Sequence, residues 1–219
     1  KHLARPLTMQ LRDSAEGLRG QLRLLRPRNP HVIMEAFLVA TGIVALAEMG
    51  DKTQLLALVL AARFRKPWPI VLGIFTATVV NHALAGAVGA FVTQWLGPTT
   101  LRWLLGGGFI AMALWMLIPD KLDEEDTGTR SHFGVFGTTV VAFFLAEMGD
   151  KTQIATVMLA ARFVNDYIGV VAGTTFGMML ANAPVVFLGE RIMRRVPIKL
   201  VHGISAAIFL VLGVVMIVG

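Results

Sequence analysis

One charged eight-residue motif occurs twice in the chain. Ala47–Gln54 and Ala146–Gln153 both read Ala-Glu-Met-Gly-Asp-Lys-Thr-Gln. Each copy lies inside an otherwise apolar stretch that is long enough to cross a membrane. Charged side chains at that depth cost several kcal/mol unless they are paired, hydrated or bound to a metal. The two copies are therefore the first candidates for a functional site.

The carboxylates of the motif are suitable ligands for a hard divalent cation. On a continuous helix the Glu and Asp of one motif share a face, because they are three residues apart. If the two motif helices cross at their motifs, four carboxylates converge. Carboxylate and amide oxygens suit Mn²⁺, Ca²⁺ or Mg²⁺, and the chain has no cysteine to offer a thiolate. The predicted metal ligands are Glu48, Asp51, Glu147, Asp150, Gln54 and Gln153.

The remaining polar residues of the motif are expected to balance charge or gate the site, and they are Lys52, Lys151, Thr53 and Thr152. The two lysines offset two of the four negative charges, and a remainder of about −2 suits one divalent cation. Crowded carboxylates also hold protons when no metal is present, so the same groups could bind metal and protons in turn. The alternative is a buried ion-pair network that only fixes one helix against the other.

Three further polar residues lie in apolar stretches outside the motifs. Asn81 and His82 fall in the middle of the second stretch, and Asn182 falls in the middle of the fifth. They are candidates for a transport pathway or a proton relay. Hydrogen bonding between helices is the alternative role.

The elements that must position these residues are membrane helices. Of the 219 residues, 55% are hydrophobic and the mean hydropathy is +0.68, which is typical of an integral membrane protein. In lipid, such segments must be helical. We therefore predict an all-α integral membrane fold with six transmembrane helices, at about 33–62, 70–96, 102–118, 133–161, 168–189 and 200–219.

The six helices are predicted to form two inverted repeats. Residues 34–119 and 133–219 each contain three predicted helices with a motif on the first, and the acidic segment 120–132 joins them. The chain crosses the membrane three times between the motifs, so the two motif helices run in opposite directions. Folds of this kind commonly bind substrate between the repeats near the membrane midplane.

The net charge of +6 does not indicate nucleic-acid binding. Residues 1–33 hold seven basic and two acidic residues, so this N-terminal arm accounts for +5 of the total. The arm is either a segment that lies on an anionic membrane surface or an upstream extension without a function of its own. Basic loops favour the cytoplasm, which places loops 63–66 and 191–199 and the acidic linker on that side.

The two E-x-G-D-K-T motifs, Glu48–Thr53 and Glu147–Thr152, closely resemble those of the Gdt family of cation/proton exchangers. The resemblance covers essentially residues 34–219 and places the chain near the bacterial manganese exporters of the lysine-exporter superfamily. It implies a multi-pass protein of the bacterial inner membrane that exchanges Mn²⁺, or Ca²⁺, for protons. The metal is then cargo, and no resident cofactor, enzymatic activity or nucleic-acid partner is expected.

A rival function for the same acidic site is a channel or leak for divalent cations, in which the carboxylates act as a selectivity filter. An exchanger requires uphill flux and a fixed ratio of metal to protons, whereas a channel permits neither. An intramembrane enzyme is disfavoured because no nucleophile or second chemical motif accompanies the acids.

Overall fold

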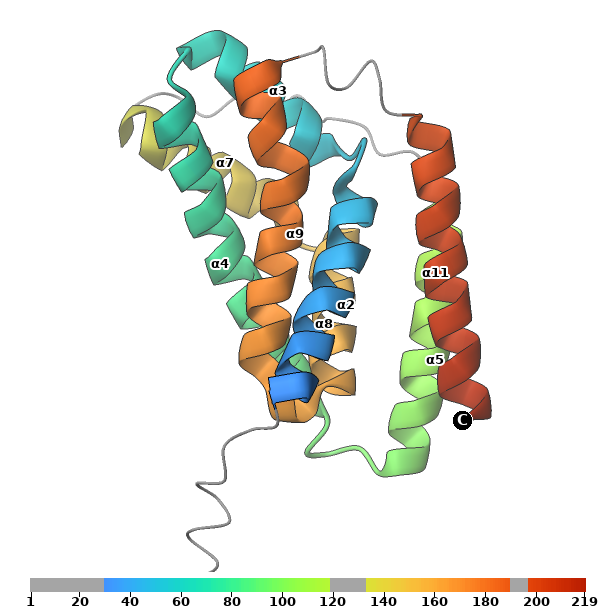
Figure 1. Ribbon diagram of the computed structural model, residues 1–219. Coiled ribbons are helices and arrows are strands. Elements are labelled where there is room, and N and C mark those ends of the chain that lie inside the picture. Colours follow the sequence, from blue (N-terminus) through green and yellow to red (C-terminus); the bar gives the residue numbers. More distant parts are fainter. Residues whose placement is uncertain (1–29, 119–132, 190–196) are drawn as a thin grey trace, which may run out of the picture.

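The chain folds into a bundle of helices, shown in Figure 1 as a computed structural model. The structure describes residues 30–118, 133–189 and 197–219, and the secondary structure in these residues is helical throughout. The predicted N-terminal arm up to residue 29, the acidic linker and the loop at 190–196 lie outside the described residues. The all-α class predicted from the sequence is confirmed for the described residues.

The first half of the chain contains α2 (Pro30–Glu48), α3 (Lys52–Phe64), α4 (Pro67–Val92) and α5 (Pro98–Trp115). The second half contains α7 (Gly134–Glu147), α8 (Lys151–Arg162), the short 3₁₀ helix η2 (Val164–Asp166), α9 (Tyr167–Leu188) and α11 (Ile198–Val218). Proline at the first helical position starts α4 and α5, where its missing N–H costs nothing. At the start of α9, the Asp166 side chain accepts a hydrogen bond from the Gly169 N–H.

Both motif helices are interrupted, and the prediction of continuous helices over 33–62 and 133–161 is wrong. Each helix ends at the motif glutamate and a new one begins at the lysine four residues later. Gly50 and Gly149 have φ values of +84° and +73°, which glycine adopts without steric cost. The following residues, Asp51 and Asp150, are extended. The Glu and Asp of one motif therefore do not share a helix face, and the break brings them together instead.

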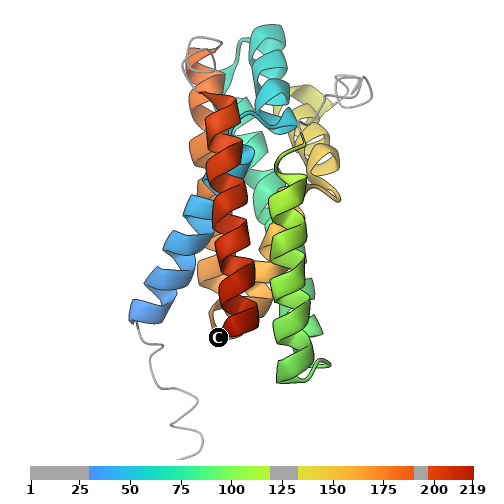
Figure 2. The ribbon, with the colours of Figure 1, turned by 90° about the vertical axis from the view of Figure 1, so that its right-hand side faces the viewer.

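The helices form a central bundle with a lateral pair (Figures 1 and 2). In the bundle, α2 packs along α9, and α4 packs against α7, α8 and α9. The helices α5 and α11 stand together at one side, and they contact the bundle through α8 and α2. Gly106 and Gly213 allow this pair to approach closely, since a Cβ on Gly213 would lie 2.8 Å from the Gly106 carbonyl oxygen.

Within the described ranges, three segments are long and apolar enough to cross a membrane: Pro67–Val92, Val164–Leu188 and Ile198–Val218. The segment Gly134–Glu147 is apolar but shorter. Neither motif helix is among these three segments, and each is divided at its motif. The described residues therefore form a membrane-type helical fold, in which the breaks lie where the charges are.

Candidate metal centre

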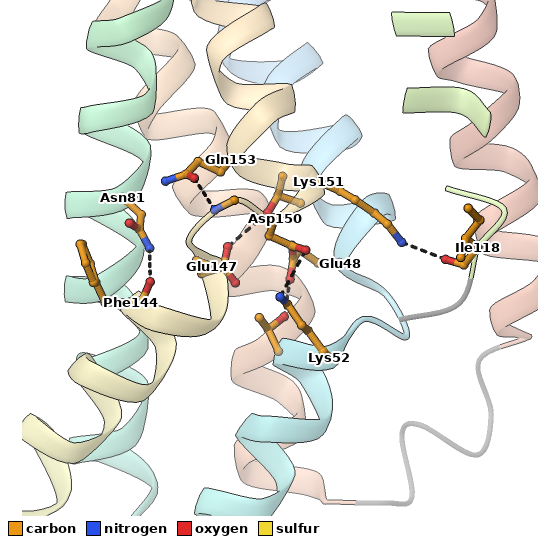
Figure 3. Close-up of polar contacts among 12 residues, drawn as sticks. Glu48, Lys52, Asn81, Ile118, Phe144, Glu147, Asp150, Lys151 and Gln153 are labelled. Carbon is orange, nitrogen blue, oxygen red and sulfur yellow. Dashed lines mark hydrogen bonds and ion pairs between the residues drawn. The ribbon is translucent and has the colours of Figure 1, made fainter. Parts of the chain in front are cut away.

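The two breaks meet in the interior of the bundle and bring the motif side chains together (Figure 3). Glu48 and Glu147 are the last residues of α2 and α7, while Asp51 and Asp150 precede the first residues of α3 and α8. Each acid thus lies at a helix end, where backbone groups lack helical partners. Interrupted helices of this kind bind ions in membrane transporters, through the exposed ends of the half-helices.

Three of the four predicted acids form a compact buried cluster. Glu48, Asp51 and Asp150 each offer a carboxylate oxygen, and these oxygens all lie within 4.8 Å of one another. Their side chains are 0%, 3% and 4% exposed, respectively. Like charges this close repel strongly in a low dielectric, so the cluster is stable only with cations or protons between the carboxylates.

The fourth acid, Glu147, lies beside the cluster but is not part of it. It is completely buried and within electrostatic range of Glu48 and Asp150 (Figure 3). One oxygen of Glu147 and one of Glu48, Oε1 in each case, are buried and accept no hydrogen bond from the described residues. A buried carboxylate oxygen without a hydrogen-bond donor destabilises the folded protein. A bound cation or a proton on the carboxyl group would satisfy it.

The motif threonines hold the other oxygen of each glutamate. The Thr53 hydroxyl donates to Glu48 Oε2 over 2.5 Å, and the Thr152 hydroxyl donates to Glu147 Oε2 over 3.2 Å. Thr152 also lies close to the Glu48 carboxylate. The threonines therefore orient the glutamates, and the predicted role in gating stays a prediction.

The motif glutamines are directed toward backbone groups. Gln54 Oε1 accepts a hydrogen bond from the Gly50 N–H over 2.9 Å, and its amide donates to the Ala181 oxygen over 3.0 Å. In the second motif, Gln153 Oε1 accepts from the Gly149 N–H over 2.7 Å (Figure 3). Both glutamines thus satisfy an N–H that the break releases from helical pairing. Their predicted role as metal ligands stays a prediction.

The two motif lysines have different surroundings. Lys52 Nζ lies 3.6 Å from Asp150 Oδ1, so the lysine of the first motif pairs with an acid of the second. Lys151 is 2% exposed, and its ammonium donates to the Ile118 oxygen over 3.0 Å and lies 5.9 Å from the centre of the Trp115 ring. Figure 3 shows Lys151 pointing away from Glu48 and toward the end of α5.

The candidate pathway residues are all buried. Asn81 donates to the Phe144 oxygen over 3.1 Å, which ties α4 to α7 near the second break. Asn182 donates to the Met178 oxygen, and it also lies close to the Glu48 carboxylate. His82 is fully buried, and neither ring nitrogen has a hydrogen-bond partner within the described residues. The structure thus places Asn182 beside the acids.

A residue that the sequence did not single out also reaches the first motif. His202 Nε2 lies 3.1 Å from the Met49 oxygen, although 153 residues separate the two positions. The only signal in the sequence was that His202 is a polar residue near the start of a predicted apolar helix. No spacing rule connects it to the motif, because the contact depends on how α11 packs.

The chemistry available to this site is reversible binding of a hard cation. The atoms available to a metal are carboxylate oxygens, the chain has no cysteine, and His202 contacts the first motif at a backbone oxygen. Because the same carboxylates bind protons, metal and protons compete for them. A buried, competitive site of this kind can serve an exchange reaction.

Comparison with known proteins agrees with this chemistry. The model of a family described as "Divalent cation/proton antiporter GDT1" matches residues 36–124 and 135–219. A Vibrio cholerae protein named "Putative manganese exporter" is 47% identical over 87% of this chain and 94% of its own length. A GDT1-like protein of Synechocystis is 26% identical over 84% of this chain and 97% of its own length. No solved structure matches the chain significantly.

Proposed function

Because the chain belongs to the GDT1 family of divalent cation/proton antiporters, we propose that it exports Mn²⁺ from the cell in exchange for protons. The observation that carries the proposal is the buried cluster of Glu48, Asp51 and Asp150 at two helix breaks. The family consists of transporters, so the chain is not an enzyme. The name of the Vibrio cholerae relative favours Mn²⁺ over Ca²⁺ as the exported ion.

In this proposal, Mn²⁺ binds among the carboxylates of Glu48, Asp51 and Asp150, and Glu147 completes the charge around it. When the metal leaves, protons replace it, because four buried acids that lie this close together cannot all stay ionised. The unsatisfied oxygens of Glu48 and Glu147 support this exchange of occupants. Asn182, which lies close to Glu48, is then on the path of the ion or the proton.

The proposed architecture has six transmembrane spans arranged as two inverted repeats. In this arrangement α2 with α3, and α7 with α8, each count as one interrupted span. Alternating access then arises as one half of the molecule rocks against the other around the fixed site. The corresponding breaks and their matching hydrogen bonds, Gly50 with Gln54 and Gly149 with Gln153, support the internal symmetry.

The proposed location is the bacterial inner membrane. Loops 63–66 and 191–199 and the acidic linker 120–132 face the cytoplasm in this proposal, because basic loops are retained on that side. Mn²⁺ would therefore enter the site from the face that carries these loops and leave on the opposite face.

The decisive experiment uses purified protein in liposomes with an imposed pH gradient. A metal-sensitive dye follows Mn²⁺ in the lumen, and a second dye follows lumenal pH. We expect uphill Mn²⁺ accumulation that is coupled to proton movement and abolished in Glu48→Gln. Glu35→Gln is the matched control, since Glu35 lies on the same helix but is exposed and outside the cluster.

Two results would overturn the proposal. Mn²⁺ flux that runs only downhill and ignores the pH gradient would indicate a channel that uses the same acidic cluster. Full transport in Glu48→Gln would remove the cluster from the mechanism. Repeating the assay with Ca²⁺ in place of Mn²⁺ measures the selectivity between the two ions.

A further inference from the structure

We infer that His202 is a positioning residue of the metal site, which restrains the break of the first motif through the Met49 carbonyl. This inference deepens the proposed function. The transport experiment below rests on that function, whereas the hydrogen–deuterium exchange experiment does not.

The contact fits a gap in the backbone hydrogen bonding of the break. Helix α2 ends at Glu48, so the carbonyls of its last turn lose their helical partners. The Glu48 oxygen accepts a hydrogen bond from the Asp51 N–H over 3.1 Å. The next oxygen, on Met49, is met by His202 Nε2 over 3.1 Å. A carbonyl can only accept, so Nε2 of His202 carries the proton and donates it.

A second contact from α11 covers the same break. A Cβ on Gly50 would lie 2.6 Å from Ile198 Cγ2, so the side chain of Ile198 rests directly on the glycine. Ile198 and His202 are four residues apart and share one face of α11. The first two turns of α11 therefore cover both Met49 and Gly50.

The second motif shows what the same sequence does without such a cover. Its eight residues are identical, and its break has the same backbone form at Gly149. Yet no atom of the described residues lies within 4 Å of a Cβ on Gly149, and the Met148 side chain is 57% exposed. The cover is thus not needed to form a break. What α11 adds to the first motif is restraint.

The restraint acts on two of the three clustered acids. Glu48 and Asp51 flank Met49 and Gly50, so the position of this short segment sets the distance between their carboxylates. A site that holds its ligands in place binds a cation more tightly than one that must order them first. Loss of the His202 N–H should therefore weaken Mn²⁺ binding more than it slows turnover.

Hydrogen–deuterium exchange of the full-length protein tests the restraint without any transport. We expect His202→Leu to speed exchange in peptides that contain Met49–Asp51 by about threefold to tenfold, the value of one net hydrogen bond. Peptides from the second motif should not change. His202→Gln, whose amide can donate in place of Nε2, should restore slow exchange. Ser205→Ala is the control on α11, because Ser205 bonds only to Val201 of its own helix among the described residues.

If His202→Leu speeds exchange equally in both motifs, the bundle has loosened as a whole and the inference is overturned. Unchanged exchange at the first motif would also overturn it. If His202→Leu fails to fold, Ile198→Ala removes the other contact of α11 and should speed exchange at Met49–Asp51 alone. Unchanged exchange in a folded Ile198→Ala would contradict the cover.

Mn²⁺ transport in liposomes supplies the functional test. We expect His202→Leu to raise the KM for Mn²⁺ by about threefold to tenfold, with kcat within about twofold of the unmodified protein, and His202→Gln to rescue the KM. A fall in kcat at constant KM would overturn the positioning role. If the unmodified protein moves no Mn²⁺, the proposed function fails, and the exchange experiment still decides whether His202 restrains the break.

Discussion

Alanine at the two motif glycines should have unequal effects, although the motifs are identical in sequence. Gly50 and Gly149 both have positive φ, which costs an alanine about 1–2 kcal/mol. A Cβ on Gly149 meets no atom of the part of the chain that the structure describes, so Gly149→Ala should lose only that amount. A Cβ on Gly50 would collide with Ile198, and overpacking adds about 1–3 kcal/mol. We therefore expect Gly50→Ala to lose about 2–5 kcal/mol.

The assay measures the apparent Tm of the purified protein in detergent, obtained from the fraction that stays monodisperse after heating. A loss of 1 kcal/mol lowers the Tm of a chain of this size by about 2–4 °C. The expected drop in Tm is therefore about 2–8 °C for Gly149→Ala and about 4–20 °C for Gly50→Ala. Gly42→Ala is the control, because Gly42 lies exposed inside α2 and no described residue is near its Cβ, so the change should be neutral or stabilising. Equal Tm losses for the two motif glycines would refute the reasoning from Ile198.

Two further predictions concern the side chains around the acids. Lys52→Gln removes the cation 3.6 Å from Asp150 and leaves the cluster more negative. The KM for Mn²⁺ should therefore fall by about twofold to fivefold, a modest effect because Lys52 is 21% exposed. A higher KM would contradict this reasoning. Thr53→Val removes the hydroxyl that donates to Glu48, and we expect a loss of about 1–3 kcal/mol in the same Tm assay. Thr152→Val removes a longer bond in the second motif and should cost less, so a larger loss there would count against the geometry.

The sequence predicted the membrane helices well because their signal is local. The apolar stretches at 70–96, 168–189 and 200–219 correspond to α4, α9 and α11 within a few residues. Each of these helices can be predicted from its own residues, since lipid-facing helices need continuous apolar residues. The motif acids were also evident, because charges inside such stretches are rare.

The breaks were missed because a glycine inside a helix is weak evidence. It costs only about 1 kcal/mol relative to alanine, and many membrane helices tolerate it. The stronger signal was the combination of Gly50 with Asp51 and Gln54, which can end one helix and satisfy the start of the next. His202 could not be found from the sequence, because its contact with Met49 depends on tertiary packing across 153 residues.

The two motifs have identical sequences, so any difference between them must come from the helices around them. In this structure α11 covers the first break, and α5 and α11 pack on α8 and α2. Among the described residues, α5 and α11 make no contact of comparable extent with α7 and α3, the counterparts of α2 and α8 in the proposed repeats. An inverted repeat permits a second conformation in which the halves exchange these environments. Under the proposed mechanism, α5 would then cover the second break and α11 would leave the first. Transport would move the restraint from one pair of acids to the other while the eight-residue motifs stay the same.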